Sequence, residues 1–164
     1  MVYKMMIFVD GGCRGNGQPG AIGAAASILM LRYGGYIAST QSLPLYPAPT
    51  NQRAELKAVI LGLEQALARY DELDASPALD VTIHSDSRYV IDCMTVWIDK
   101  WIRRGWINAA GNEVANRDLL ERASELDDEL RNLGNLKYKW IPREDNQIAD
   151  GLCNDDMDMQ QGLF

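Results

Sequence analysis

The sequence predicts an α/β fold in which helices pack on a five-stranded mixed sheet. Near the N-terminus, three apolar segments (5–9, 21–31 and 36–43) follow one another across turns that contain glycine, which is typical of an antiparallel three-strand meander. Two further strand-like segments (79–84 and 136–141) follow stretches with helical apolar spacing, and strands joined through helices are usually parallel. Together the two patterns indicate a mixed sheet.

The composition is that of a globular protein with one domain. The chain has 164 residues, of which 47% are hydrophobic and 24% charged. No apolar run approaches the ~18–20 residues of a membrane span, and the first strand begins almost at Met1, so we expect no membrane segment and no signal or transit peptide. Cys13, Cys93 and Cys153 form no CxxC pair, which indicates a reducing intracellular compartment (cytoplasm or nucleus) and no zinc site.

Taken as totals, the net charge of −7 and the pI of about 4.7 argue against a nucleic-acid partner. The distribution is uneven, however: residues 144–158 hold six acids and no base, whereas residues 97–104 hold three bases and one acid. A metal-dependent nuclease can show this pattern, because the carboxylates of its site count as negative until cations bind. An ordinary acidic protein is the alternative.

The first strand ends at an aspartate. Residues 5–9 are an uninterrupted apolar run, Asp10 follows, and a glycine-rich segment (11–20) begins at once. A carboxylate at the end of a buried strand is held rigidly, as a metal ligand or an acid–base group must be, and glycine allows another backbone or a ligand to approach closely. The alternative is an aspartate that merely opens a turn.

A long helix is predicted from its N-cap Thr50 to about Tyr70. It follows a loop, 44–49, whose three prolines exclude a helix or a central strand. Its apolar residues recur at helical spacing, and Glu55 lies in the first turn at the edge of that apolar face. Glu55 therefore either complements the helix dipole or points at the sheet.

Asp86 directly follows the strand 79–84, and so repeats the pattern at the end of the first strand. In open α/β sheets, ligands gather at such strand ends. Further helices are predicted from Ser87 to Gly105, from Asn116 to Gly134, and from Asp145 or Asn146 to Asn154. Asp150 lies near the start of the last helix. We expect a folded domain over 1–154 and a polar, frayed tail over 155–164.

Four carboxylates thus stand at the ends of elements: Asp10, Glu55, Asp86 and Asp150. If they meet, they repel one another unless cations are bound. Two divalent cations roughly 3.5–4 Å apart would neutralise them and form a two-metal site for phosphodiester hydrolysis. Oxygen ligands without a Cys/His cluster favour Mg²⁺, with Mn²⁺ as a substitute. The alternative is that the four acids stand apart, because spacing along the chain does not show convergence.

Five segments carry a family resemblance: 10–20 (DGGCRGNGQPG), 50–56 (TNQRAEL), 85–90 (SDSRYV), 97–106 with its three tryptophans, and 146–150 (NQIAD). In this order they resemble the motifs of type 1 ribonucleases H, including the substrate-binding handle of that family. The resemblance covers about residues 5–154. It implies the RNase H-like fold, with helices on both faces of the sheet, as a catalytic domain over residues 1–154.

The resemblance also implies an endoribonuclease that hydrolyses the RNA strand of RNA/DNA hybrids by a two-metal-ion mechanism and leaves 5′-phosphate and 3′-hydroxyl ends. By position, the catalytic and metal-binding acids are Asp10, Glu55, Asp86 and Asp150, with two Mg²⁺ ions. Contacts with the hybrid are implied for Gly11, Gly12, Cys13, Asn16, Asn51, Gln52, Arg88, Trp97, Lys100, Trp101, Arg103, Arg104 and Trp106. We expect a monomer without a small-molecule cofactor.

Two features of the site are open to more than one interpretation. Trp97 and Trp101 share one helical face, where they either lie beside a phosphate backbone together with the neighbouring bases or simply pack the helix, and both roles are compatible. His84, the only histidine, is interpreted as a packed strand residue rather than as a displaced catalytic base.

The sequence departs from many family members, which carry a histidine on the loop before the last metal-binding acid. Residues 141–146 are short and lack histidine, so the chain resembles the branch without it; Arg143 or Glu144 could substitute. The alternative function is a catalytically silent hybrid-binding module, which the presence of all four acids disfavours. Another nuclease or an integrase on the same fold is a weaker alternative, since those proteins lack the motif series. The handle has few lysines, so we expect modest, salt-sensitive binding.

Overall fold

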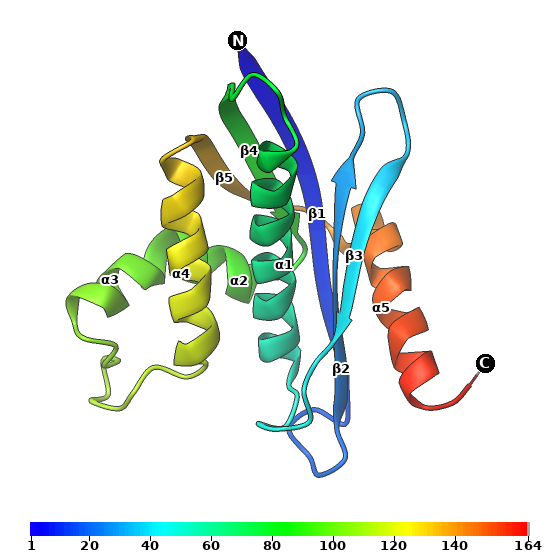
Figure 1. Ribbon diagram of the computed structural model, residues 1–164. Helices are drawn as coiled ribbons and strands as arrows, with labels where there is room; N and C mark the ends of the chain where they lie inside the picture. The colour runs from blue at the N-terminus through cyan, green and yellow to red at the C-terminus, as the bar shows by residue number, and fades with distance from the viewer. Residues whose placement is uncertain (164) are drawn as a thin grey trace.

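The computed structural model describes residues 1–163, and its five strands form one mixed sheet in the order β3-β2-β1-β4-β5 (Figure 1). The strands are β1 (Val2–Arg14), β2 (Ile22–Met30), β3 (Tyr36–Ser42), β4 (Ala78–Ser85) and β5 (Gly134–Trp140). The first three pair antiparallel, whereas β4 pairs parallel with both β1 and β5. The predicted meander followed by two parallel strands is confirmed. The expected end of the first strand at Asp10 is wrong, because β1 continues to Arg14 through its antiparallel pairing with the start of β2.

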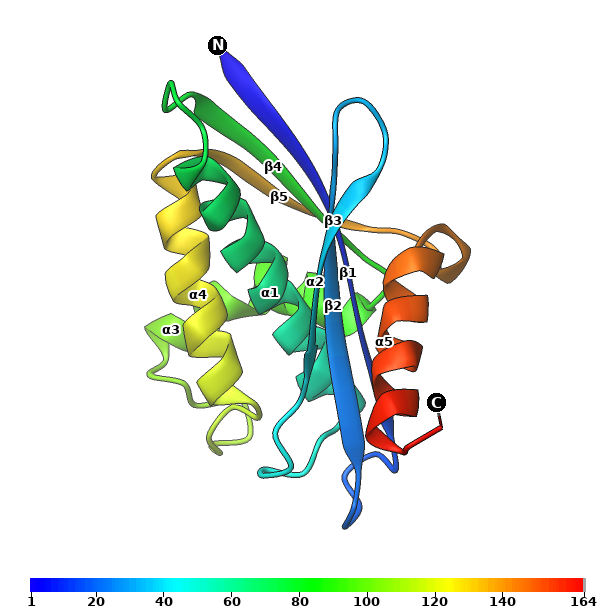
Figure 2. The ribbon, with the colours of Figure 1, turned by 45° about the vertical axis from the view of Figure 1, so that its right-hand side comes forward.

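Helices cover both faces of the sheet (Figure 2). They are α1 (Asn51–Asp71), α2 (Arg88–Asp92), α3 (Ile98–Arg103), α4 (Arg117–Arg131) and α5 (Gln147–Gln160). The first and fourth pack together on one face, and α5 lies on the other. A π-helical turn (Cys93–Trp97) joins α2 to α3. No helix within residues 1–163 is long and apolar enough to cross a membrane.

The main core lies between β1 and α1. Met5, Ile7 and Val9 alternate along β1 toward the apolar side of α1, and all three are buried. Thr50 is the N-cap of α1 as predicted, since its hydroxyl accepts a hydrogen bond from the Arg53 N–H (3.1 Å). This packing fixes the middle of β1, which carries Asp10, relative to α1.

A second, smaller core lies under α5. Ala24 and Ala26 of β2 pack against Ala149, Cys153 and Met157 of α5, and small residues let the helix approach closely. We expected fraying after Asn154, but residues 155–160 continue the helix. Two contacts that the local sequence pattern did not reveal explain the difference. Met157 is buried, and the Arg14 guanidinium pairs with Asp158 at 2.8 Å.

Asn116 stands at the N-cap of α4, where the sequence predicts the start of a helix, but its side chain does not cap that helix. Its backbone is left-handed (φ 63°), and its side chain makes no capping hydrogen bond. Instead its amide donates to the Tyr89 hydroxyl (3.1 Å) and accepts from Arg53 (3.4 Å), so it ties α4 to α1 and α2. A tertiary contact has replaced a local one.

Candidate active site

Two adjacent parallel strands place Asp10 and Asp86 at the same edge of the sheet. Val9 is in register with Ser85, and the two aspartates are the next residues of β1 and of the turn after β4. Asp10 is only 8% exposed. Asp150 lies in the first turn of α5, and the Cys153 thiol donates to the Asp10 carbonyl (3.1 Å), which holds that helix against β1.

Gly11 brings Glu55 to the same place. A Cβ on Gly11 would overlap the Ala54 carbonyl and lie 2.5 Å from the Glu55 nitrogen, so only glycine lets β1 touch the start of α1. The Glu55 carboxylate accepts a hydrogen bond from the Ser87 hydroxyl (2.6 Å), in the turn that carries Asp86. Glu55 therefore points toward the sheet edge, which was one of its two predicted roles.

Burial and neighbouring carboxylates raise the pKa values of two of these acids, Asp10 and Glu55. Burial, followed by the charges of Asp86 and Asp150 and an interaction with the Asp150 carboxyl, raises the pKa of Asp10 to about 8; the Gly11 N–H opposes this rise. Burial and the charge of Asp86 also raise the pKa of Glu55, against the Ser87 hydroxyl and the Arg143 charge. Perturbations of this kind are typical of functional sites.

Asp86 is held by two residues from distant parts of the chain. The Asn146 amide donates to an Asp86 carboxylate oxygen (3.3 Å) and to the Val9 carbonyl (2.8 Å), and the Trp140 indole donates to the Asp86 carbonyl (3.1 Å). In the sequence, Asn146 stands out only as part of a motif, and neither Ser87 nor Trp140 is identified as a supporting residue. Their contacts cross from one element to another, so no local pattern could reveal them.

The donor set fits a divalent cation. Its atoms are carboxylate oxygens, which Mg²⁺ and Mn²⁺ prefer. Burial is the main cause of the raised pKa of Asp10, and a cation would relieve the further contribution from the charges of Asp86 and Asp150. Within residues 1–163, no three Asp, Glu, His or Cys side chains lie close enough together to hold an ion on their own. Mg²⁺ commonly binds through one or two carboxylates, with water and substrate phosphate as the other ligands.

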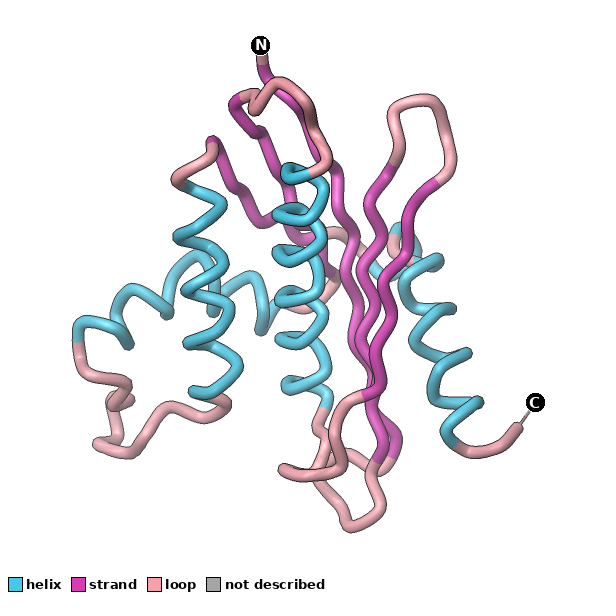
Figure 3. The backbone as a smooth tube through the Cα atoms, in the orientation of Figure 1, coloured by secondary structure: helices cyan, strands magenta, loops and turns pink. Residues whose placement is uncertain are grey.

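The glycine-rich turn and the start of α1 lie side by side (Figure 3). The Asn16 side chain accepts a hydrogen bond from the Asn51 N–H (2.8 Å), and the Cys13 thiol donates to the Pro49 carbonyl (3.3 Å). The structure thus brings together Cys13, Asn16 and Asn51, which the sequence placed in two separate motifs. Gln52 is exposed beside Asn51.

Arg88 and the handle supply the remaining candidate contacts. The Arg88 guanidinium lies over the Trp140 ring, 3.9 Å from its centroid, two residues after Asp86. In the handle, Trp97 is 44% exposed and stacks on Trp101 with 6.2 Å between centroids.

The handle shows both roles that were considered for its tryptophans. Trp101 and Trp106 pack against the core, while Trp97 remains at the surface with the Lys100 ammonium 5.0 Å from its ring centroid. Arg103 and Arg104 are exposed. The packed rings therefore fix a surface that carries one aromatic ring and three cations.

His84 is a packed residue, as predicted. It is buried, stacks on Phe8 with 4.3 Å between ring centroids, and its ring Nδ1 donates to the Ile7 carbonyl (3.0 Å). Burial lowers its pKa, which favours the neutral form of the ring. In the loop that follows β5, the Arg143 charge acts on Glu55 and opposes the rise of its pKa.

A mixed sheet that brings carboxylates together around Asp10 is an arrangement that a metal-dependent nuclease can use. The family model for RNase H matches residues 3–157. A ribonuclease H from Erythrobacter litoralis is 33% identical over 161 residues, which are 96% of this chain and 98% of the relative. The chain therefore belongs to the RNase H family.

Solved structures agree with this assignment. The N-terminal RNase H domain of Rv2228c from Mycobacterium tuberculosis, solved as a fusion with maltose-binding protein, has a TM-score of 0.70 and 26% identity, and the match covers 98% of this chain and 99% of that one. LC11-RNase H1, solved in complex with an RNA/DNA hybrid, has a TM-score of 0.67 over 92% of this chain and 94% of that one. At 24% identity, the latter likeness supports the fold.

Proposed function

We propose that this protein is an endonuclease that hydrolyses the RNA strand of RNA/DNA hybrids and leaves 5′-phosphate and 3′-hydroxyl ends. The observation that carries the proposal is the gathering of carboxylates around the buried Asp10: burial and the charges of Asp86 and Asp150 raise the pKa of Asp10, and the charge of Asp86 also acts on Glu55. Relatives named ribonuclease H and the hybrid-bound neighbour LC11-RNase H1 support the choice of substrate.

The proposed cofactor is Mg²⁺, two ions per site, with Mn²⁺ as a substitute. Asp10, Glu55, Asp86 and Asp150 are the residues that would hold the ions. Bound divalent cations supply Lewis-acid activation of water and charge stabilisation at the leaving oxygen in phosphodiester hydrolysis. The cluster of oxygen donors and the raised pKa of Asp10 support this choice.

The supporting residues act by holding the carboxylates in place. The Ser87 hydroxyl orients Glu55, and the Asn146 amide orients Asp86 against the end of β1. The Arg143 charge stabilises the ionised form of Glu55, because it lowers the pKa of that carboxyl. Such outer partners commonly affect metal affinity or activity by about 10- to 100-fold.

The surface around Cys13, Asn16 and Asn51 is the proposed contact with the minor groove of the hybrid, together with Gly11, Gly12, Gln52 and Arg88. Backbone and amide groups there can contact successive 2′-hydroxyls, which distinguish RNA from DNA. The handle would hold the phosphate backbone through Lys100, Arg103 and Arg104 beside the Trp97 ring. We propose that one copy of the chain suffices for both surfaces.

The test is a gel assay with labelled RNA offered as RNA/DNA hybrid, RNA duplex or single strand, each with Mg²⁺, Mn²⁺ or EDTA. We expect metal-dependent cuts within the RNA of the hybrid alone, and fragments whose 3′ ends a polymerase can extend. Hybrid binding without any cleavage would instead indicate the silent binding module. Equal cleavage of all three substrates would contradict the proposed specificity.

A further inference from the structure

Trp140, the last residue of β5, contacts a proposed metal ligand from the neighbouring strand. It is in register with Ser85, the residue before Asp86. Its indole N–H donates a hydrogen bond to the Asp86 carbonyl over 3.1 Å. Trp140 therefore holds the backbone of Asp86 in place.

The face of the same indole carries Arg88. The central carbon of the Arg88 guanidinium lies 3.9 Å from the ring centroid, well within the ~6 Å over which a cation and an aromatic ring attract each other. Arg88 is exposed, and none of the ion pairs found within residues 1–163 includes it. One face of the guanidinium is thus occupied by the ring, whereas its charge is not neutralised by a carboxylate of the described chain.

An arginine in this setting is suited to a phosphate. Its planar guanidinium presents five N–H donors in a fork that matches phosphate oxygens, and stacking on a ring fixes the plane of that fork before binding. A 2′-hydroxyl is uncharged and would leave the charge of Arg88 without a partner. Arg88 follows Asp86 by two residues, so their Cα atoms are at most ~7.6 Å apart and the phosphate would lie next to the carboxylates.

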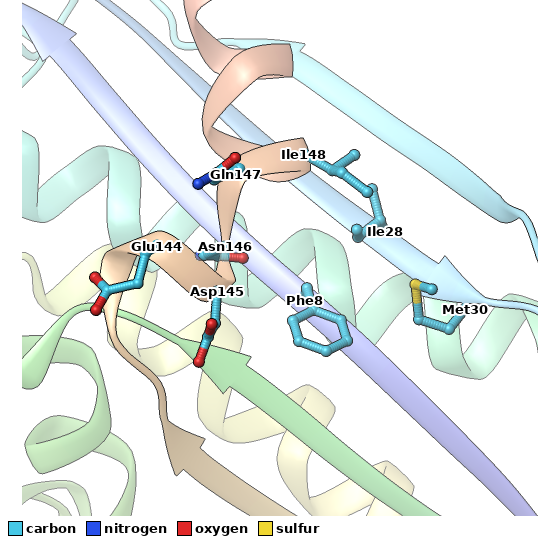
Figure 4. Close-up of a pocket in the computed structure, with 8 residues that line it drawn as sticks. All are labelled: Phe8, Ile28, Met30, Glu144, Asp145, Asn146, Gln147 and Ile148. Carbon is cyan, nitrogen blue, oxygen red and sulfur yellow. The ribbon is translucent and has the colours of Figure 1, made fainter.

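The loop after Trp140 provides a second contact with the same metal ligand. It spans residues 141–145 and leads to Asn146, which lies against β1 at the start of α5 (Figure 4). There the Asn146 amide donates to the Val9 carbonyl (2.8 Å) and to the Asp86 carboxylate (3.3 Å). The residues at the two ends of one short loop therefore hold Asp86, one by its carbonyl and the other by its carboxylate.

We propose that Trp140 is a positioning residue that couples a phosphate contact at Arg88 to the proposed metal ligand Asp86. The inference rests on the proposed hydrolysis of RNA/DNA hybrids, and it specifies how the substrate backbone is aligned with the carboxylates. One rigid side chain contacts Arg88 through its ring and Asp86 through its N–H. A hybrid phosphate bound by Arg88 is therefore held in a fixed position relative to the proposed metal ligand.

The alternative is that Trp140 only packs the end of β5 and that Arg88 covers its ring. The two roles differ in the properties that they affect. A packing residue contributes to the free energy of unfolding, whereas a positioning residue also affects kcat, the Mg²⁺ dependence and hybrid binding. Substitutions that remove the N–H and the ring separately distinguish the two roles.

Trp140→Phe separates the two contacts, because it keeps an aromatic face for Arg88 and removes the indole N–H. We expect kcat for hybrid cleavage to fall by about 10-fold or more, as is common for residues that orient metal ligands. The Mg²⁺ concentration that gives half of the Mg²⁺-induced rise in Tm should increase. The Kd for the hybrid in EDTA should stay close to that of the parent.

Trp140→Leu removes the ring as well, and it is compared with Arg88→Ala. Arg88→Ala should weaken hybrid binding by about 10-fold at low salt and reduce the slope of log K against log salt by about 1. Trp140→Leu should also weaken binding, because Arg88 loses the ring that orients it. The double variant should bind almost like Arg88→Ala, since the effects of residues that act through one contact are not additive.

Tyr138→Phe is the matched control. It removes a hydroxyl that donates to Asp127 (2.6 Å) from the same strand, two residues before Trp140, and it leaves the contacts of Trp140 with Asp86 and Arg88 in place. Its kcat, its Mg²⁺ midpoint and its Kd should equal those of the parent. Thermal unfolding of every variant shows whether the fold is intact.

Unchanged kcat and an unchanged Mg²⁺ midpoint in Trp140→Phe would overturn the link to Asp86. Additive effects of Trp140→Leu and Arg88→Ala on Kd would overturn the link to Arg88, and a loss of thermal stability alone would leave Trp140 a packing residue. Failure of the proposed function is seen separately. A parent that binds the hybrid without cleaving it contradicts hydrolysis, while the Kd in EDTA and the Mg²⁺ midpoint still test the role of Trp140.

Discussion

The Ser87 hydroxyl donates to the Glu55 carboxylate over 2.6 Å, and so joins the turn after β4 to the first turns of α1. The same hydroxyl accepts a hydrogen bond from the Val90 N–H (3.2 Å) and caps α2. One small side chain therefore orients a proposed metal ligand and also starts the helix that leads into the handle.

Ser87→Ala should lower kcat for hybrid cleavage by about 10- to 100-fold, because Glu55 loses the group that orients it. It should also cost ~1 kcal/mol of unfolding free energy, because α2 loses its cap. Ser87→Thr keeps the hydroxyl, so its kcat and its unfolding free energy should both be close to those of the parent. If Ser87→Ala lowers stability but leaves kcat and the Mg²⁺ dependence unchanged, Ser87 has only the capping role.

Asp10→Asn and Asp86→Asn should each nearly abolish cleavage while hybrid binding persists. Asparagine is similar in size to aspartate but uncharged. Each replacement therefore removes one charged oxygen ligand and leaves the surface around Asn16 and Asn51 intact. Single-turnover cleavage and a binding titration in EDTA measure the two properties separately. Cleavage by either variant at close to the parent rate would contradict the site assignment.

The raised pKa of Asp10 makes the stability of the metal-free protein depend on pH. Burial and the neighbouring carboxylates raise this pKa from 3.8 to about 8 in the folded chain. Between these values the folded state holds a proton that the unfolded state has lost. Stability therefore falls as pH rises from about 4 to about 8, by on the order of a few kcal/mol.

Urea unfolding in EDTA at several pH values measures this dependence. Asp10→Asn removes the titrating group, so its stability should fall less than that of the parent over the same pH range. Mg²⁺ binds the ionised carboxylates, so it should stabilise the parent more at high pH than at low pH. Parallel curves for parent and Asp10→Asn would show that Asp10 does not titrate in this range.

Gly11 and Gly151 offer a matched pair of substitutions. Gly11→Ala forces a Cβ into the Ala54 carbonyl, so it should destabilise the protein by ~3 kcal/mol or more and separate Asp10 from Glu55. A Cβ added at Gly151, in α5, would meet no atom within 4 Å, so Gly151→Ala should stabilise by ~0.5–1 kcal/mol through helix propensity. Thermal unfolding of both variants measures the two changes in stability. Changes of similar size and sign in Gly11→Ala and Gly151→Ala would contradict the prediction.

Local signals were enough to predict most of the fold. The apolar run before Asp10, the Thr50 cap and the strand before Asp86 each act over a few residues, and the structure has them where the sequence placed them. The continuation of α5 and the role of Asn116 depend on partners far along the chain. Arg14 and Asp158, for example, are 144 residues apart in sequence.

The same distinction between local sequence signals and long-range contacts applies to the proposed site. The four acids of the proposed site were selected because each was expected at the end of an element and lies within a motif, although β1 in fact continues past Asp10 to Arg14. The residues that orient them, Ser87 for Glu55 and Asn146 for Asp86, do so through contacts that exist only once the elements have packed. No periodicity or cap signal distinguishes such a serine from any other N-cap.

The handle should make hybrid binding depend strongly on salt. Its Trp97 ring is exposed, Lys100 lies over that ring, and Arg103 and Arg104 are exposed nearby. Each phosphate contact that binding neutralises adds to the slope of log K against log salt. Arg103→Ala and Arg104→Ala should therefore weaken binding at low salt and reduce this slope by about 1 each.

Trp97→Ala separates the aromatic contribution from the charges. It removes an exposed ring without removing a cation, so binding should weaken by ~1–3 kcal/mol while the salt slope stays close to that of the parent. Arg122→Ala on α4 removes a cation that already pairs with Glu125 and should change neither quantity. Titrations of hybrid at several salt concentrations check these expectations. A nearly flat salt dependence in the parent would mean that phosphate contacts contribute little, and the handle would then be a packing element rather than a binding surface.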